Sequence, residues 1–110
     1  MENEKFISGM VMYTIKDENL MNAIRESIIE NLEGKRLDQS CYEINCNDKT
    51  TGEIVEKIME LCEKAEKKTN AEFFKDDSNE NSDFVTFYRA TNSDYKNNRD
   101  KIQRIPVVGE

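Results

Sequence analysis

The sequence predicts a single α+β domain in which two amphipathic helices alternate with short strands. Apolar residues recur at a spacing of about four in segments 18–34 and 54–65, which is the period of a helix with one buried face. Segments 6–15, 41–46 and 83–90 instead alternate polar and apolar residues or carry β-branched and aromatic runs, as strands do. A chain of 110 residues has room for one hydrophobic core, so we expect one domain over 1–110.

The first predicted strand, 6–15, carries apolar residues on both faces. Ile7, Val11, Tyr13 and Ile15 share one side at a period of two, and the methionines of "GMVM" occupy the other. Apolar residues on both faces are typical of a central strand that is covered at least partly on each side.

The first helix is predicted to follow Asp17, which is well placed to cap it. Leu20, Ile24, Ile28 and Leu32 form its buried stripe. Gly34 stands where a helix normally ends in a left-handed residue, so we expect the helix to end there.

The middle of the chain is predicted to form two short strands joined near Asp38. In the second of these, Tyr42, Ile44 and Cys46 point to one side, and the residues between them point to the other. A loop is expected over 47–53 (NDKTTGE), where Thr50 and Glu53 have the spacing of a capping box. The second helix then runs to about Lys68.

The last third of the chain combines polar loops with two strands. Segments 73–83 and 91–100 are rich in Asp, Asn and Ser and predict loops, the first of them mobile. A strand is expected over 83–90, and a final one over about 101–108, where Pro106 restricts it to a sheet edge.

This order of elements predicts a ferredoxin-like βαββαβ sandwich with an extra C-terminal strand. Both helices then cover one face of the sheet, and the other face exposes Met10, Met12 and part of "FVTFY". A homodimer stacked sheet to sheet would cover that face, with each final strand extending the sheet of the partner.

Charge and composition exclude several functions. The net charge of −7 argues against generic binding of nucleic acid, although it leaves room for a local basic patch. The absence of histidine excludes Ser-His-Asp and Cys-His nucleophiles and the common zinc sites that contain histidine. Three cysteines are expected to be free thiols, since Cys41 and Cys46 lie five apart in a strand and face opposite sides. No apolar run is long enough to span a bilayer and no signal-like segment is present, so the expected location is the cytoplasm.

The element order and several segments resemble the small CRISPR-associated ferredoxin-like nucleases, the SinR-like proteins and the GhoS-type antitoxin ribonuclease. The resemblance extends over residues 6–108 and includes the strand that ends in Lys16-Asp17, "LDQSCYEI", "DFVTFYRA" and the trailing "KIQRIPVV". The last of these is similar to a strand that crosses between subunits of the family's dimers. The resemblance implies a role in antiviral defence or in the control of mobile elements.

The resemblance also implies a catalytic metal site at Asp17. In the family, an Asp at the end of the first strand and its symmetry mate hold a divalent cation, here Mg²⁺ or Mn²⁺, for phosphodiester hydrolysis. Asp17 is the matching position. A second interpretation is that Asp17 only caps the helix. The neighbouring Lys16 favours this capping interpretation, because the lysine ammonium would compete with a cation.

Other candidates lie near strand ends. Arg36, Arg89 and Arg104 are predicted to contact phosphate groups of nucleic acid, or else to be ordinary exposed arginines. Asp38 and Ser40 are explained by turn chemistry, although either could contact a substrate.

Three functions therefore remain open at the level of the sequence. The first is a homodimeric, metal-dependent endonuclease or endoribonuclease. The second is a non-catalytic scaffold, antitoxin or inhibitor that binds a protein partner. The third is an acidic mimic of nucleic acid that occupies the basic channel of a nucleic-acid-binding protein.

Overall fold

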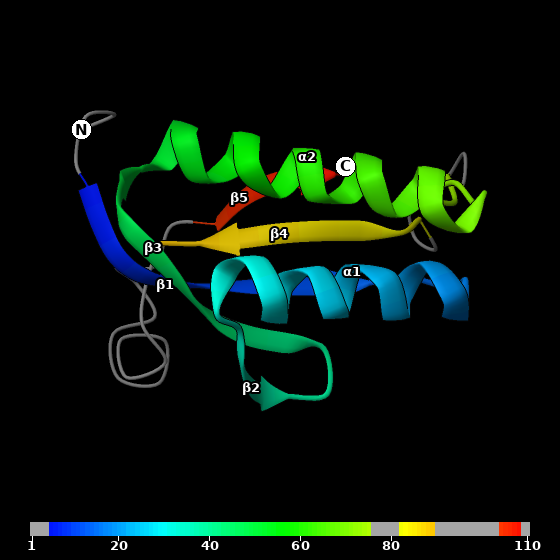
Figure 1. Ribbon diagram of the computed structural model, residues 1–110, viewed down its shortest axis with the longest axis horizontal. Coiled ribbons are helices and arrows are strands. Elements are labelled where there is room, and N and C mark those ends of the chain that lie inside the picture. The colour runs from blue at the N-terminus through cyan, green and yellow to red at the C-terminus, as the bar shows by residue number, and fades with distance from the viewer. Residues whose placement is uncertain (1–4, 76–81, 90–103, 109–110) are drawn as a thin grey trace.

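In the computed structural model, two helices pack on one face of a five-stranded antiparallel sheet (Figure 1). The structure describes residues 5–75, 82–89 and 104–108. The strands follow the order β2-β3-β1-β4-β5 across the sheet. The elements are β1 (Lys5–Thr14), α1 (Glu18–Leu32), β2 (Lys35–Asp38), β3 (Cys41–Thr50), α2 (Thr51–Thr69), β4 (Phe84–Tyr88) and β5 (Arg104–Val108). The α+β class is confirmed, and the arrangement is consistent with a ferredoxin-like fold.

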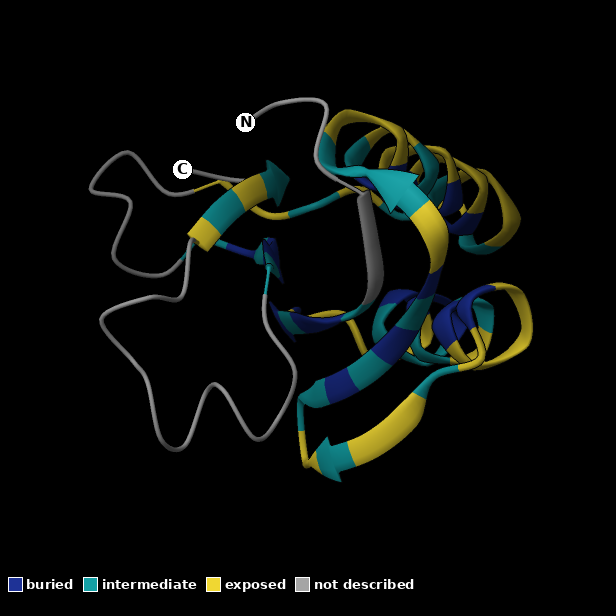
Figure 2. Ribbon diagram, turned by 90° about the vertical axis from the view of Figure 1, so that its left-hand side faces the viewer, coloured by how far each residue is buried: buried dark blue, intermediate teal, exposed yellow. Residues whose placement is uncertain are grey.

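The hydrophobic core lies between the sheet and the two helices (Figure 2). β1 occupies the middle of the sheet, and Val11 pairs with Tyr42 of β3 on one side and with Phe87 of β4 on the other. All three side chains are buried in the core. The predicted apolar stripes of the helices are confirmed, since their members pack into the same core: Leu20, Ile24, Ile28, Leu32, Ile54, Ile58, Leu61, Cys62 and Ala65.

The opposite, helix-free face of the sheet is formed by the alternate residues of β1, β3 and β4. Strand register assigns it the following residues: Ser8, Met10, Met12, Thr14, Cys41, Glu43, Asn45, Phe84, Thr86 and Tyr88. Met10 and Thr86 are each only 1% exposed, whereas Met12, Phe84 and Tyr88 are half-buried. The helix-free face is therefore less exposed in the single chain than the sequence predicted.

The first helix ends differently from the prediction. Glu33, not Gly34, adopts the left-handed conformation, with φ 53°, and its N–H donates to the Ile28 carbonyl. Gly34 is required for a different reason: a Cβ there would lie 2.8 Å from Cγ2 of Ile28 and 3.1 Å from its carbonyl oxygen. The prediction of a left-handed Gly34 is wrong, because the close approach of the chain to Ile28, and not the sign of φ, excludes a side chain.

The predicted loop over 47–53 is also wrong. β3 continues to Thr50, and its last residues pair with the start of β1, Lys49 with Phe6 and Thr50 with Lys5. Asn47 and Asp48 have φ of 52° and 57°, and the register shifts opposite them. Asn and Asp tolerate the left-handed region better than other residues with side chains, so this polar stretch forms an irregularity within the strand and not a loop.

The capping box of the second helix is confirmed. Oγ1 of Thr50 accepts a hydrogen bond from the Glu53 N–H at 3.3 Å, and Oε1 of Glu53 accepts one from the Thr50 N–H at 3.0 Å. Helix α2 therefore begins directly at the end of β3.

The final strand, β5, pairs with β4 of its own chain and lies at the edge of the sheet. Pro106 is opposite Thr86, and this edge position is the one expected for a proline. The start of the predicted strand, 101–103, the loop 91–100 and most of the loop 73–83 lie outside the described residues. Exchange of β5 between two subunits stays a prediction.

Candidate functional site

Asp17 lies on the surface between β1 and α1 and caps the helix. Its backbone is extended (φ −74°, ψ 118°), and Oδ1 accepts a hydrogen bond from the Leu20 N–H at 2.9 Å. Its carbonyl accepts the first bond of the helix, from the Met21 N–H, also at 2.9 Å. The capping role is thus confirmed. Among the described residues, no hydrogen bond or ion pair engages the second carboxylate oxygen, Oδ2, which leaves it available for another partner.

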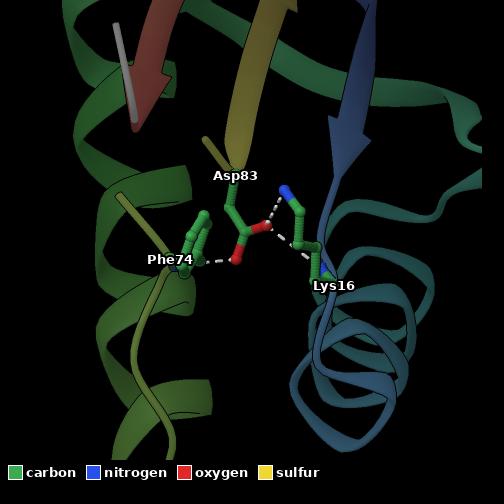
Figure 3. Close-up of polar contacts among 3 residues, drawn as sticks. All are labelled: Lys16, Phe74 and Asp83. Carbon is green, nitrogen blue, oxygen red and sulfur yellow. Dashed lines mark hydrogen bonds and ion pairs between the residues drawn. The ribbon is translucent and has the colours of Figure 1, made fainter. Parts of the chain in front are cut away.

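The residue beside Asp17, Lys16, interacts with a buried carboxylate from another part of the chain (Figure 3). Asp83, which directly precedes β4, is 1% exposed. Its Oδ1 accepts a hydrogen bond from the Lys16 backbone N–H at 3.0 Å, and its Oδ2 accepts one from the Phe74 N–H at 2.8 Å. The Lys16 ammonium lies 3.8 Å from Asp83 Oδ1 and 4.8 Å from the centre of the Phe74 ring.

We call Lys16, Phe74 and Asp83 the sheet-end clasp, because they join β1, the segment after α2 and β4 at one end of the sheet. A second backbone bond, from the Asp83 N–H to the Phe74 carbonyl at 2.8 Å, completes it. The sequence analysis missed Asp83. Its one signal was an acidic residue directly before an apolar strand, which is also common in ordinary loops.

Asp17 and the clasp together determine which carboxylate oxygens a cation could use. Both Asp83 oxygens accept backbone hydrogen bonds, and the Lys16 ammonium provides the neighbouring positive charge. Asp17 offers one oxygen, so Mg²⁺ or Mn²⁺ at this position would need the Asp17 carboxylate of a second subunit and several waters. Among the described residues there is no group of three or more side chains suited to hold a metal ion.

The three predicted arginines do not form one patch within the described chain. Arg36 is on β2 and Arg104 is on β5, at opposite edges of the sheet. Arg104 is exposed opposite Tyr88, so Arg89, the next residue, lies near it. Both are at the end of β4 remote from Asp17, separated from it by the length of that strand, roughly 17 Å at 3.3 Å per residue.

The residues of the β2–β3 turn act structurally. Oδ1 of Asp38 accepts a hydrogen bond from the Gln39 N–H at 2.7 Å, and the Ser40 carbonyl accepts one from the Tyr13 N–H at 3.1 Å. The first contact is the turn chemistry expected from the sequence, and the second ties the turn to β1.

The cysteines are free, and burial keeps them in the thiol form. Burial raises the pKa of Cys46 to about 11 and, with Glu66 and Glu63 nearby, that of Cys62 to about 12. The pKa of Cys41 is raised by burial and then by Asp38. Cys41 and Cys46 belong to opposite faces of the sheet, as predicted, so they form neither a disulfide nor a shared metal site.

Comparison with protein-family models, with curated proteins and with solved structures found no match for this chain. In the part of the chain that the structure describes, neither helix has the length and apolar character that crossing a membrane requires.

Proposed function

We propose that this protein is a dimeric, cytoplasmic, nucleic-acid-associated protein of the CRISPR-associated and antitoxin ferredoxin-like type that binds its target without cutting it. The order of elements and the position of Asp17 after the first strand support the assignment to this ferredoxin-like type of protein. The engagement of its acidic residues supports binding without hydrolysis.

The observation that carries the proposal is the structural use of the two carboxylates at the end of β1. Asp17 caps α1 through Oδ1, and Asp83 is buried between two backbone amides with Lys16 beside it. Lys16, the residue before Asp17, directs its half-exposed ammonium to Asp83 and adds positive charge to this end of the sheet. Positive charge at this end of the sheet disfavours the binding of a cation there.

The helix-free face is the surface we propose for the dimer. Register places no charged residue on this face in β1 and β4, and charged residues that it places there on the other strands include Lys35 of β2, Glu43 of β3 and Arg104 of β5. Two copies that each carry a charge of −7 repel, so a face with little charge is the one on which they can meet. The Thr86 hydroxyl is buried on this face with no hydrogen-bond partner among the described residues, and a second copy could supply one.

A nuclease assay with a matched variant tests the proposal. Labelled single-stranded RNA, single-stranded DNA and duplex DNA are incubated with the protein and with Mg²⁺ or Mn²⁺. Asp17→Asn serves as the control, because Asn caps a helix about as well as Asp but lacks the carboxylate charge. We expect full-length nucleic acid with both proteins; cleavage by the wild type that Asp17→Asn abolishes would contradict the proposal.

A metal-dependent nuclease is the second candidate, favoured by the exposure of Asp17 and by its available Oδ2. In a dimer that brings two Asp17 side chains together, the pair could hold Mg²⁺ or Mn²⁺, which would polarise a phosphate and activate water. The same assay separates the two candidates.

A further inference from the structure

Arg25 of α1, which was not a candidate from the sequence, and Arg36 of β2 both act on the same buried tyrosine, Tyr13. Arg36 of β2 pairs with Tyr42 of β3, whose side chain is buried under the helices, so Arg36 lies on the helix side of the sheet. Arg25 is half-buried on α1, which runs beside β2 and β3 (Figure 1). The positive charges of both arginines act on the hydroxyl of Tyr13.

Two stacked tyrosines, Tyr13 and Tyr42, lie near the two arginines. The rings of Tyr13 and Tyr42 are nearly parallel, with 16° between their planes and 6.3 Å between their centres. They are 2% and 3% exposed. Burial, followed by the neighbouring Tyr42, raises the pKa of Tyr13 to about 12 despite the two arginines. Tyr13 is therefore a neutral phenol at physiological pH and supplies no negative charge to the arginines.

Neither arginine has an anionic partner among the described residues. No ion pair joins either guanidinium group to a carboxylate of the described residues. Arg36 donates from Nε to the Asp38 carbonyl at 3.4 Å, a neutral acceptor. On α1, the residues three and four positions from Arg25 are Met21, Asn22, Ile28 and Ile29, none of them acidic. The two arginines thus have no ion pair among the described residues, and the carboxylate of Asp38, two positions from Arg36, accepts its hydrogen bond from the Gln39 N–H.

We infer that Arg25 and Arg36 form a phosphate-binding site between α1 and β2 that contacts the backbone of the bound nucleic acid. This inference rests on the proposed function for the identity of the ligand. A guanidinium group matches the oxygens of a phosphate with paired hydrogen bonds, which favours arginine over lysine for this task. The site needs only two positive charges at one place, so the chain can contact nucleic acid there although its net charge is −7.

The test measures binding of a fluorescent single-stranded oligonucleotide by anisotropy over a range of salt concentrations. The variants are Arg25→Gln and Arg36→Gln, with Lys64→Gln on the exposed face of α2 as a control of equal charge change. We expect each arginine variant to weaken binding about tenfold and to reduce the salt slope by about one, with the control close to wild type. Thermal unfolding of each variant confirms that it is folded.

A second arm, a titration with inorganic phosphate followed through the arginine Nε–H resonances, separates the inference from the proposed function. If the oligonucleotide binds and both arginine variants bind as tightly as the wild type, the phosphate site is wrong and the proposed function stands. If phosphate shifts the Arg25 and Arg36 resonances but no oligonucleotide binds, the anion site stands and the proposed function falls. If neither ligand binds, both are wrong.

Discussion

The Asp83 carboxylate accepts a hydrogen bond from the backbone N–H of Lys16, and the ammonium of the same lysine lies 3.8 Å from it. Lys16 ends the β1 region and Asp83 begins the β4 region, 67 positions later in the chain. The contact therefore fixes where the chain leaves β1 and where it enters β4, and it holds the side chain of the residue before Asp17 against Asp83.

Replacing Asp83 by Ala should lower the free energy of unfolding by about 2–4 kcal/mol, because two backbone N–H groups lose their acceptor in a buried place. Lys16→Met keeps the apolar stem and should cost less than about 1 kcal/mol, since the ammonium is half exposed. Urea denaturation monitored by circular dichroism gives both values. Equal losses for the two variants would show that the ion pair, and not the backbone bonds, stabilises the clasp.

The cap of α1 predicts a contrast between two substitutions of Asp17. Asp17→Ala should lower the free energy of unfolding by about 1 kcal/mol, because the Leu20 N–H loses its acceptor. Asp17→Asn keeps an acceptor and should change that free energy by only a few tenths of a kcal/mol. The midpoints of thermal unfolding measure the difference. A stable Asp17→Ala variant would mean that the cap contributes nothing in solution.

The two helix-associated glycines predict opposite outcomes. Gly34→Ala should destabilise by about 1–3 kcal/mol, because the new Cβ would lie 2.8 Å from Cγ2 of Ile28 and the chain would have to move. Gly52→Ala, in the first turn of α2, meets nothing within 4 Å and should leave stability unchanged or raise it by up to about 1 kcal/mol. Chemical denaturation of the Gly34→Ala and Gly52→Ala variants measures both free energies of unfolding. If Gly34→Ala leaves the stability unchanged, the close packing of the chain against Ile28 is wrong.

Alkaline pH should weaken the fold. Burial raises the pKa of Cys46 from 9.0 to about 11 and those of Cys62 and Tyr13 to about 12. The unfolded chain therefore releases these protons first, so the stability is fully present below about pH 9 and falls as the pH rises toward 11–12. Unfolding free energies measured at pH 7, 9 and 10.5 test this.

The control for the alkaline prediction is Cys62→Ala, which removes the buried thiol whose pKa is raised to about 12. Its stability is lower at pH 7 but should decline less steeply above pH 9. If the wild type is equally stable at pH 7 and 10.5, the three groups are more accessible in solution than their burial indicates.

The sequence was sufficient for the parts of the fold that follow from periodic burial. The stripes from Leu20 to Leu32 and from Ile54 to Ala65 are buried as predicted, and so is the alternation of Tyr42, Ile44 and Cys46. The capping box of Thr50 and Glu53 is a local pattern, and it too is confirmed. These features depend on residues close together in the chain.

Features that depend on distant contacts were not predictable from the sequence. The polar stretch at Asn47 and Asp48 remains within a strand because the start of β1 pairs beyond it. The role of Asp83 depends on Lys16 and Phe74, and the approach of Arg25 and Arg36 to Tyr13 depends on how α1 and β2 lie relative to β1. Asp17 became a candidate metal ligand through the resemblance, whereas its capping role was predicted from a local helix signal, and the cap is what the structure bears out.

The most direct test of the central claim follows one labelled single-stranded RNA through native and denaturing gels after incubation with excess protein and Mg²⁺ or Mn²⁺. The account predicts a shifted band on the native gel and an intact strand on the denaturing gel, for both the wild type and Asp17→Asn. Metal-dependent fragments that appear with the wild type and disappear with Asp17→Asn would contradict it.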